Sequence, residues 1–199
     1  VLKDVEKKIK PGITTKEIDK YIDEEIIKRD AKPAFKGYRG YKYASCLSVN
    51  EEIVHGIPSD RVLKDGDIIG VDLGTIVDGY YGDVAYTYPV GNIPKSVKKL
   101  LKTADTCLDL GIKAAKKGGY VGDISYEIES FAKENGYSVV RDLFGHGIGE
   151  NLHEDPLIPN FGKKGEGPRL EEGMVFAIEP MVNVGKSDIR TLDDGWTVV

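Results

Sequence analysis

Two aspartates in the first half of the chain have a spacing that could do chemistry. Asp72 and Asp83 lie in two apolar-rich runs, residues 67–77 and 80–90, with an Asp-Gly pair at residues 78–79 between them. An Asp-Gly pair in this position is a strong signal for a two-residue hairpin turn. We therefore expect an antiparallel hairpin that carries one aspartate on each strand.

The register of this hairpin predicts that both carboxylates share one face. Counted back from the turn, Asp72 lies opposite Ala85 and Gly74 lies opposite Asp83, which makes the aspartates diagonal neighbours about 7–8 Å apart. Two carboxylates on a half-buried face repel each other and are costly to desolvate. A shared proton, basic side chains or cations would compensate them, and because no Lys or Arg occurs between residues 65 and 94, cations are favoured. The alternative is that Asp83 belongs to a surface turn and Asp72 caps a strand end.

An internal repeat adds a third carboxylate. Residues 63–72 align with residues 170–179 at an offset of 107, so that the first aspartate meets Glu179. At the same offset Gly12 meets Gly119, and each glycine lies between a helical stretch and the next helix. The chain is therefore predicted to contain two halves of helix, helix and strands, each with an acid at the same place in a strand.

Two of the three histidines lie seven positions apart, within residues 141–156. His146 is flanked by glycines, and small neighbours let the backbone approach a metal closely. His153 follows in a predicted turn. Each histidine has an ordinary alternative, because His55 by itself is typical of a turn and His153 by itself is evenly balanced between a site and a loop.

Three carboxylates and an imidazole make an oxygen-rich site with one nitrogen. Such a set suits Mn, Fe, Co or Zn better than a structural zinc cage, which favours Cys and His. Bridging carboxylates indicate two metals about 3.5–4 Å apart. Other motifs are excluded: residues 153–156 do not begin a His-Glu-x-x-His helix because position 157 is Leu, and no dinucleotide, phosphate-loop or nucleophile-elbow motif occurs.

The elements that must position these groups follow from periodicity and turn signals. Thr14 followed by Glu17 indicates a capping box at the start of a helix over residues 15–29. Further helices are predicted over residues 94–117 and 123–134, short strands over 46–50, 137–140 and 174–184, and a loop over 156–171. The fold class is accordingly mixed α/β (α+β) with mainly antiparallel strands.

Composition sets the broad class of protein. The 199 residues suffice for one domain with a sizeable core, and 40% apolar with 31% charged residues is ordinary for a soluble globular chain. The net charge of −5 argues against nucleic acid or an anionic membrane as the main partner. No apolar run approaches the roughly 18 residues of a membrane span. Cys46 and Cys107 are expected to be buried free thiols, and the cytoplasm is the expected location.

The motifs together carry a family resemblance over nearly the whole chain. In order they are SCLSVNEEIVHGIP, GVDLGTIVDGYYGDVAYTYPVG, GHGIGENLHEDP, MVFAIEPM and DGWTVV. This set resembles methionine aminopeptidase, type I. The resemblance implies the pita-bread fold, in which two pseudo-twofold related helix-helix-strand halves share a curved sheet. It also implies a metal-dependent aminopeptidase that removes the N-terminal methionine from nascent proteins and peptides.

The resemblance carries roles onto matching positions. It implies that two divalent metal ions are bound by Asp72, Asp83, His146 and Glu179, with Asp83 bridging. Glu179 also resembles the general base for a metal-bridging water that attacks the first peptide bond, and His55 and His153 resemble the non-ligand histidines that contact the scissile peptide. The pocket for the methionine side chain would be lined by Tyr38, Tyr41, Cys46, Leu152 and Trp196, with Leu152 standing where the family often has Phe.

The same resemblance implies partners. The substrates would be the N-terminal Met peptides of nascent chains, with the ribosome as a further partner. We expect no nucleic-acid substrate, no membrane and a monomer.

One family ligand has no counterpart in these residues. The resemblance implies a bridging glutamate on a strand after residues 194–198, and the sequence stops at Val199. In the second half of the repeat, the position eleven residues after Glu179 is Arg190 rather than an acid. We expect residues 1–199 to be a single catalytic domain, truncated at both ends, that binds two metals poorly by itself. Normal turnover of the tripeptide Met-Ala-Ser by these 199 residues would contradict that expectation.

Two other functions stay open at this point. An X-Pro peptidase of the same fold is one alternative, although such enzymes carry an extra amino-terminal domain. The type II methionine enzyme is expected to carry a long insertion that the 25 residues between His153 and Glu179 do not accommodate. A non-catalytic binding protein of this fold is the alternative from another class, and it should have lost internal ligands.

Overall fold

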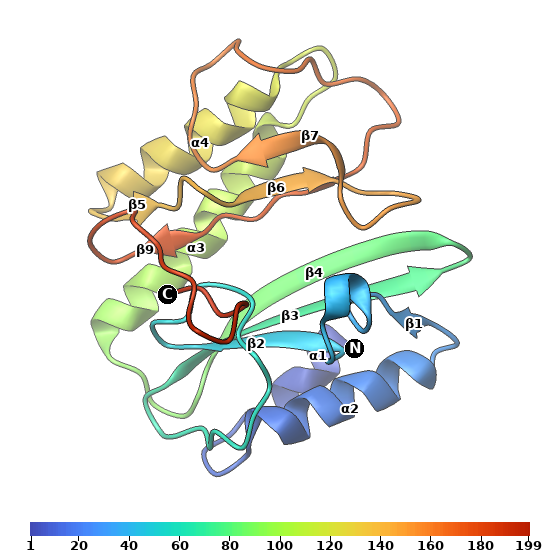
Figure 1. Cartoon of the computed structure of the whole chain (residues 1–199). Helices are drawn as coiled ribbons and strands as arrows, with labels where there is room; N and C mark the ends of the chain where they lie inside the picture. The colour runs from blue at the N-terminus through green and yellow to red at the C-terminus, as the bar shows by residue number, and fades with distance from the viewer. The chain divides into compact units, whose positions relative to one another are not determined.

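The computed structural model describes all 199 residues, which divide into two compact units. Unit 1 contains residues 1–94, 150–152 and 190–199, and unit 2 contains residues 95–149 and 153–189. Unit 1 carries α1 (Leu2–Val5), η1 (Glu6–Lys8), α2 (Thr15–Ile27), β1 (Lys32–Pro33), η2 (Tyr38–Gly40), β2 (Ser45–Val49), β3 (Ile68–Val77) and β4 (Tyr80–Pro89) (Figure 1). Unit 2 carries α3 (Lys95–Ala114), α4 (Val121–Glu134), β5 (Ser138–Val139), β6 (Phe144–Gly147), β7 (Glu154–Pro159), β8 (Phe176–Ala177) and β9 (Val182–Asn183).

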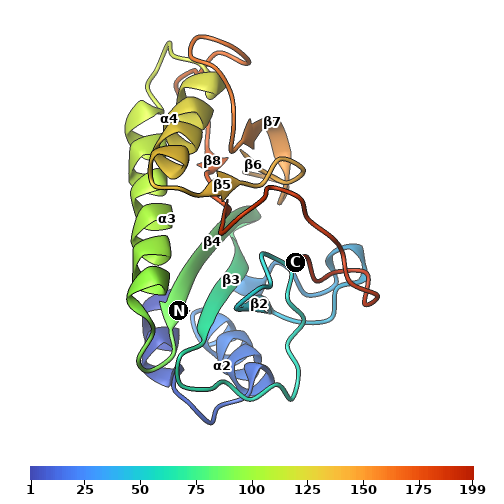
Figure 2. The ribbon, with the colours of Figure 1, turned by 90° about the vertical axis from the view of Figure 1, so that its left-hand side faces the viewer.

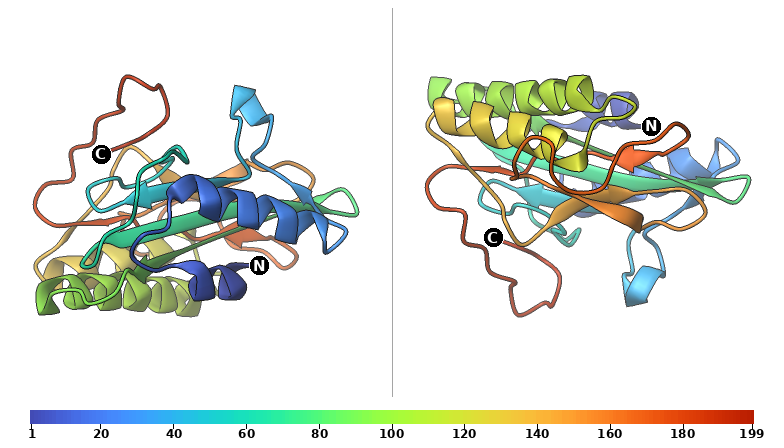
Figure 3. Two further views of the ribbon diagram at one scale, coloured as in Figure 1. Left: turned by 90° about the horizontal axis from the view of Figure 1, so that it is seen from below. Right: turned by 90° about the horizontal axis from the view of Figure 1, so that it is seen from above.

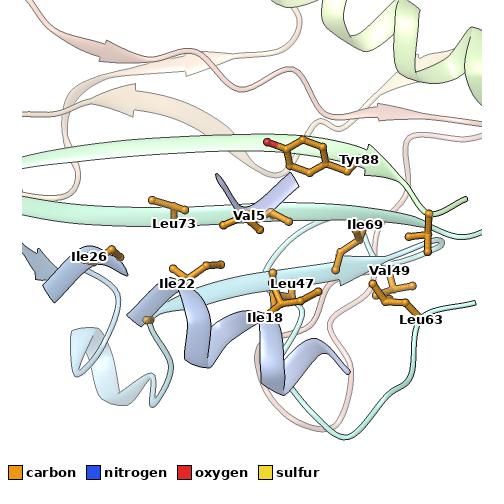
Figure 4. Close-up of a cluster of buried hydrophobic side chains, with 13 residues drawn as sticks. Val5, Ile18, Ile22, Ile26, Leu47, Val49, Leu63, Ile69, Leu73 and Tyr88 are labelled. Carbon is orange, nitrogen blue, oxygen red and sulfur yellow. The ribbon is translucent and has the colours of Figure 1, made fainter. Parts of the chain in front are cut away.

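The sheet of unit 1 is built around β3. β4 pairs with one edge of β3 along its whole length, and β2 and β1 pair with the other edge, all antiparallel. α2 runs along one face of this sheet (Figure 3). Its isoleucines Ile18, Ile22 and Ile26 repeat every fourth residue and form one helix face, which packs on Leu47 and Ile69 of the sheet (Figure 4).

The predicted hairpin is confirmed residue by residue. Asp72 pairs with Ala85 and Gly74 pairs with Asp83 across β3 and β4. The two turn residues at positions 78 and 79 both adopt positive φ angles, 51° and 86°. This is the backbone that a two-residue type I′ turn requires, and it is the reason that Asp-Gly predicts such a turn.

Unit 2 packs two helices on a small sheet. α3 and α4 lie side by side (Figure 2), and Gly111 allows their close approach, because a Cβ there would lie 3.1 Å from the Ile128 side chain. α4 contacts β7, and β6 pairs with both β7 and β8. The core beneath α4 contains Ile124, Ile158 and the buried thiol of Cys107, whose pKa is raised to about 11 by burial.

The internal repeat is present in the hydrogen bonds inside each unit, with one correction. The Gly12 N–H donates to the carbonyl of Leu63, and the Gly118 N–H donates to the carbonyl of Leu170. Gly12 and Gly118 both have positive φ. The structural partner of Gly12 is thus Gly118 rather than the predicted Gly119, because Leu170 follows Gly118 by 52 positions whereas Leu63 follows Gly12 by 51, so the second half has one extra residue in this stretch.

Two predicted boundaries are wrong. The strand expected over residues 174–184 is two short strands, β8 and β9, with Pro180 between them; proline cannot donate to a ladder. The loop expected over residues 156–171 begins only after β7. Pro156 is accepted in β7 because β7 is the outer strand of the order β7-β6-β8.

No helix is both long enough and apolar enough to cross a membrane.

The start of α2 supplies a test of local stability. The Thr14 hydroxyl accepts a hydrogen bond from the Glu17 N–H at 3.2 Å, and the Thr14 N–H donates to Glu17 Oε2 at 2.9 Å. We predict that Thr14→Ala lowers the free energy of unfolding by about 1 kcal/mol, measured by urea denaturation. Thr106→Ala is the control, since that hydroxyl bonds only within α3 and alanine is the better helix former. Equal losses in both variants would contradict the capping box.

The same box has a pH dependence. Its hydrogen bonds from Thr14 lower the pKa of Glu17. A carboxyl whose folded pKa is depressed stabilises the fold above its unfolded pKa and loses that contribution as pH falls through the folded value. The deficit of Thr14→Ala relative to the unmodified protein should therefore shrink when urea denaturation is repeated below pH 4 rather than at pH 7.

Candidate active site

Unit 1 holds the two aspartates on one face of its sheet. On β3, the core residues Val71 and Leu73 face α2, so Asp72 between them faces the other way. Asp83 is its diagonal neighbour on that same face, as the sequence predicted. Around Asp72 the neighbours on this face are small: Ser48, Gly70, Gly74, Ala85 and Thr87, whereas Tyr81 and Ile76 lie on the far side of Asp83. The side of the acid pair toward Asp72 is therefore lined by small side chains.

Cys46 borders this carboxylate face. It is the pairing partner of Asp72 on β2, and only 6% of its surface is exposed. Burial, together with the negative charge of Asp72, raises the pKa of the Cys46 thiol, which therefore stays protonated.

Three of the five predicted pocket residues are linked by contacts in unit 1. The Tyr41 hydroxyl donates to the carbonyl of Ser45, next to Cys46, at 2.9 Å. The Tyr41 ring meets the Trp196 ring edge-on, with centroids 4.9 Å apart. Leu152 belongs to the same unit and is buried, and Tyr38 lies in η2, three residues before Tyr41.

His55 is held in a rare backbone conformation. Its φ is 59°, a left-handed value that non-glycine residues seldom adopt. Where they do, the residue is often at a functional site. The flanking chain is pinned on both sides: the Ile53 N–H donates to the carbonyl of Val198, and the Gly56 carbonyl accepts from the Leu47 N–H of β2. Unit 1 thus contains Asp72, Asp83, His55 and the pocket residues.

Unit 2 brings His146 and Glu179 into contact. His146 lies in β6 and is 4% exposed. Its Nδ1 lies 2.8 Å from the carbonyl of Gly147, and because a carbonyl only accepts, Nδ1 carries the proton. In the neutral ring, Nε2 then carries the lone pair, which is the usual arrangement of a metal-binding histidine. His146 Nε2 lies 3.2 Å from Glu179 Oε1.

The contact between these two groups fits a bound cation. Glu179 Oε1 is buried and makes no hydrogen bond, even though His146 Nε2 is close. Two lone-pair atoms that face each other in a buried place need a proton or a cation between them. Within the units there is no ready-made cage of three or more His, Cys, Asp or Glu side chains. Each unit offers a pair of suitable donors instead.

His153 lies against the same imidazole. Its ring centroid is 4.3 Å from that of His146, and its side chain is exposed where His146 is buried. The imidazole of His153 is thus accessible from solvent, whereas that of His146 is not.

The glycines around His146 have a reason that the sequence did not reveal. A Cβ at Gly145 would lie 2.3 Å from the carbonyl oxygen of Ala177, and one at Gly147 would lie 2.3 Å from that of Asp155. The neighbouring backbone occupies the space of these side chains. The glycines are therefore required by strand packing around His146, whereas their small size in the sequence suggested that they make room for a metal.

A comparison with family models decides the class of protein. Residues 1–198 match the model of metallopeptidase family M24. The chain belongs to metallopeptidase family M24. It is thus a metal-dependent hydrolase of peptides, and the mixed fold with antiparallel sheets is the pita-bread fold, as the sequence predicted.

The relatives with high sequence identity to this chain are methionine aminopeptidases. Methionine aminopeptidase 1 of Bacillus subtilis is 53% identical over 196 residues, which cover 98% of this chain and 79% of that protein. A crystal structure of methionine aminopeptidase from Thermotoga maritima has a TM-score of 0.98 and 47% identity, covering 100% of this chain and 80% of that one. An X-Pro aminopeptidase from the same organism is more distant, with a TM-score of 0.72 and 25% identity over 49% of its length.

The glycines of this M24 chain make a stability test. Gly145→Ala should lower the free energy of unfolding by about 1–3 kcal/mol in urea denaturation, because the new methyl group meets a backbone carbonyl. Gly149→Ala is the matched control in the same motif. Its Cβ would meet only the flexible end of Glu154 at 3.1 Å, so we expect a loss below about 1 kcal/mol. A larger loss at Gly149 than at Gly145 would contradict the packing explanation.

Proposed function

We propose that this protein removes the N-terminal methionine from peptides and nascent proteins in a metal-dependent reaction. The observation that carries the proposal is the 3.2 Å contact between His146 Nε2 and the buried, unbonded Oε1 of Glu179. The diagonal pair Asp72 and Asp83 adds two further oxygen donors of the kind that such a metal site needs. Similarity to methionine aminopeptidases at about half identity supports the substrate class.

The residues that would hold divalent metal are Asp72, Asp83, His146 and Glu179. Divalent ions bound there would supply Lewis-acid chemistry, which makes water nucleophilic near neutral pH. Glu179 is also the proposed general base, which takes the proton of the attacking water and passes it to the leaving amine. Its Oε1 makes no hydrogen bond that would occupy it.

The two remaining histidines are proposed as substrate contacts. His153 is exposed beside His146, and His55 is held at a left-handed backbone position between two pinned segments. An imidazole N–H from each would donate to the peptide oxygen as negative charge develops on it, and such donors stabilise the transition state. Neither histidine is proposed to bind metal.

The proposed pocket for the methionine side chain lies in unit 1. Tyr41, Cys46 and Leu152 are buried, and Trp196 packs on Tyr41. A wall of aromatic rings, a leucine and a thiol is apolar and polarizable, which suits a thioether side chain. Tyr38 is the fifth proposed wall residue.

We further propose the finer properties that the family suggests. The chain binds two ions of Co, Mn, Fe or Zn, acts in the cytoplasm as a monomer, and meets its nascent-chain substrates at the ribosome. Residues 1–199 act together as one catalytic domain.

The activity itself is tested with short peptides. We expect slow, metal-dependent release of methionine from Met-Ala-Ser, measured by chromatography with Mn²⁺ or Co²⁺ and with EDTA, in line with the poor binding of two metals that the sequence predicts. Leu-Ala-Ser, Ala-Ala-Ser and an X-Pro peptide are the substrate controls. Preferred cleavage of the X-Pro peptide, or binding of Met-Ala-Ser without cleavage by a metal-loaded sample, would instead support one of the two alternative functions.

Substitutions of the two neighbouring histidines, His146 and His153, are predicted to have different effects on metal binding and on turnover. His146→Asn should weaken Mn²⁺ binding at least tenfold in calorimetry, because it removes a ligand whose tautomer is set by Gly147. His153→Asn should keep the metal affinity and stoichiometry but lower kcat about 10²-fold, as expected for the loss of one donor to the transition state. Equal loss of metal binding in both variants would refute the separate roles.

A further inference from the structure

A single carboxylate oxygen of α2 holds the beginning of β2. Asp19 Oδ1 accepts hydrogen bonds from the backbone N–H groups of Ala44 and Ser45, at 3.0 and 2.9 Å, and from the Ser45 hydroxyl at 2.8 Å. Ser45 is fully buried, and Ala44 is 1% exposed. Because these three donors are buried, water cannot replace the carboxylate as their acceptor. Removal of the carboxylate would therefore leave buried polar groups unsatisfied.

The segment that Asp19 holds is the one from which the proposed methionine pocket is built. Ser45 directly precedes Cys46, and its carbonyl accepts the hydroxyl hydrogen bond of Tyr41. Tyr41 in turn meets the ring of Trp196. A shift at the start of β2 would therefore displace three pocket residues together.

Desolvation of the Asp19 carboxylate opposes the stability that its hydrogen bonds to the strand provide. Burial raises the pKa of this carboxyl, although all three hydrogen bonds act in the opposite direction. Its charged form is thus disfavoured by the fold. The role of Asp19 is therefore better explained by the three donors that meet on its Oδ1 than by its charge.

We infer that Asp19 is a positioning residue for substrate selection, which fixes β2 so that Cys46 and Tyr41 fit the methionine side chain. This inference rests on the proposed function, because it assumes that these residues line the pocket. Asp19 touches neither substrate nor metal in this scheme and acts through Ser45.

Three variants separate positioning from charge and from helix stability. Asp19→Ala removes the acceptor. Asp19→Asn keeps one carbonyl oxygen that can accept from the backbone donors while removing the charge. Glu24→Gln removes a carboxylate from the same helix; Glu24 is exposed and its ion pair is with Lys20, one turn away, so it contacts no part of β2.

Substrate binding is read from the only tryptophan of the chain. Trp196 lies in the proposed pocket, so its fluorescence should change when Met-Ala-Ser is titrated into metal-free protein in EDTA, with Ala-Ala-Ser as the comparison. We expect Asp19→Ala to weaken Met-Ala-Ser binding about tenfold and to reduce the preference over Ala-Ala-Ser. Asp19→Asn should stay within about threefold of the unmodified protein, and Glu24→Gln should not differ from it. In turnover assays, KM should rise about tenfold in Asp19→Ala while kcat changes less than about twofold.

The position of β2 is read separately from Cys46. Its rate of alkylation by iodoacetamide, followed by mass spectrometry, should increase at least fivefold in Asp19→Ala and not in Asp19→Asn. Cys107 is the internal control, because it is completely buried in unit 2 and should stay unreactive unless the whole protein loosens. If Asp19→Ala does not fold, Ser45→Ala takes its place; it removes one of the three donors, so we expect about threefold weaker binding of Met-Ala-Ser.

The outcomes for the two proposals are distinct. Unchanged peptide preference and unchanged Cys46 alkylation in Asp19→Ala would overturn the role of Asp19, as would equal damage by Asp19→Asn. If the unmodified protein binds Met-Ala-Ser no better than Ala-Ala-Ser, the proposed function fails instead. In that case the alkylation rates still decide whether Asp19 positions Cys46.

Discussion

The alternation of side chains along β3 is the constraint on which unit 1 depends. Because successive residues of a strand face opposite ways, Val71 and Leu73 can enter the core under α2 only if Asp72 faces away from it. The same alternation on β4 puts Asp83 beside Asp72 and nowhere else. A slip of one residue would bury both carboxylates against the isoleucines of α2. The packing of the hydrophobic core therefore keeps Asp72 and Asp83 together on the opposite face of the sheet.

In unit 2 a single hydrogen bond, between His146 Nδ1 and the Gly147 carbonyl, fixes which atom of the imidazole faces Glu179. The carbonyl of Gly147 decides which nitrogen of His146 bears the proton, and so decides what faces Glu179. The buried glutamate oxygen beside it lacks the hydrogen bond that a purely structural carboxylate would have. Unit 2 thus meets the ordinary rules of packing and leaves one buried oxygen, Glu179 Oε1, without a hydrogen bond. Such an exception is expected where a protein binds a ligand rather than only folds.

Much of this was predictable, and the exceptions have physical causes. The hairpin register followed from Asp78 and Gly79 because only a few turns join strands with two residues. The repeat was visible, but its first aligned residues did not show that the second half has one extra residue between the glycine and the leucine, which moved the partner of Gly12 to Gly118. Residues 174–184 have a strand-like composition. Pro180 has no N–H to donate, however, and the segment forms two short strands, β8 and β9, on either side of it. Asp19 gave no signal, since its partners lie 25 and 26 residues away and no local pattern marks them.

The glycines on either side of His146 have a consequence for how this motif is inherited. They are required by two carbonyl oxygens of neighbouring backbone, those of Ala177 and Asp155, whatever His146 binds. Selection on folding alone would thus preserve Gly145 and Gly147 in a descendant that had lost its imidazole and its catalysis. The glycines alone would then mark shared ancestry, while the residue at position 146, read together with Glu179, would tell working enzymes from relatives that have kept only the architecture.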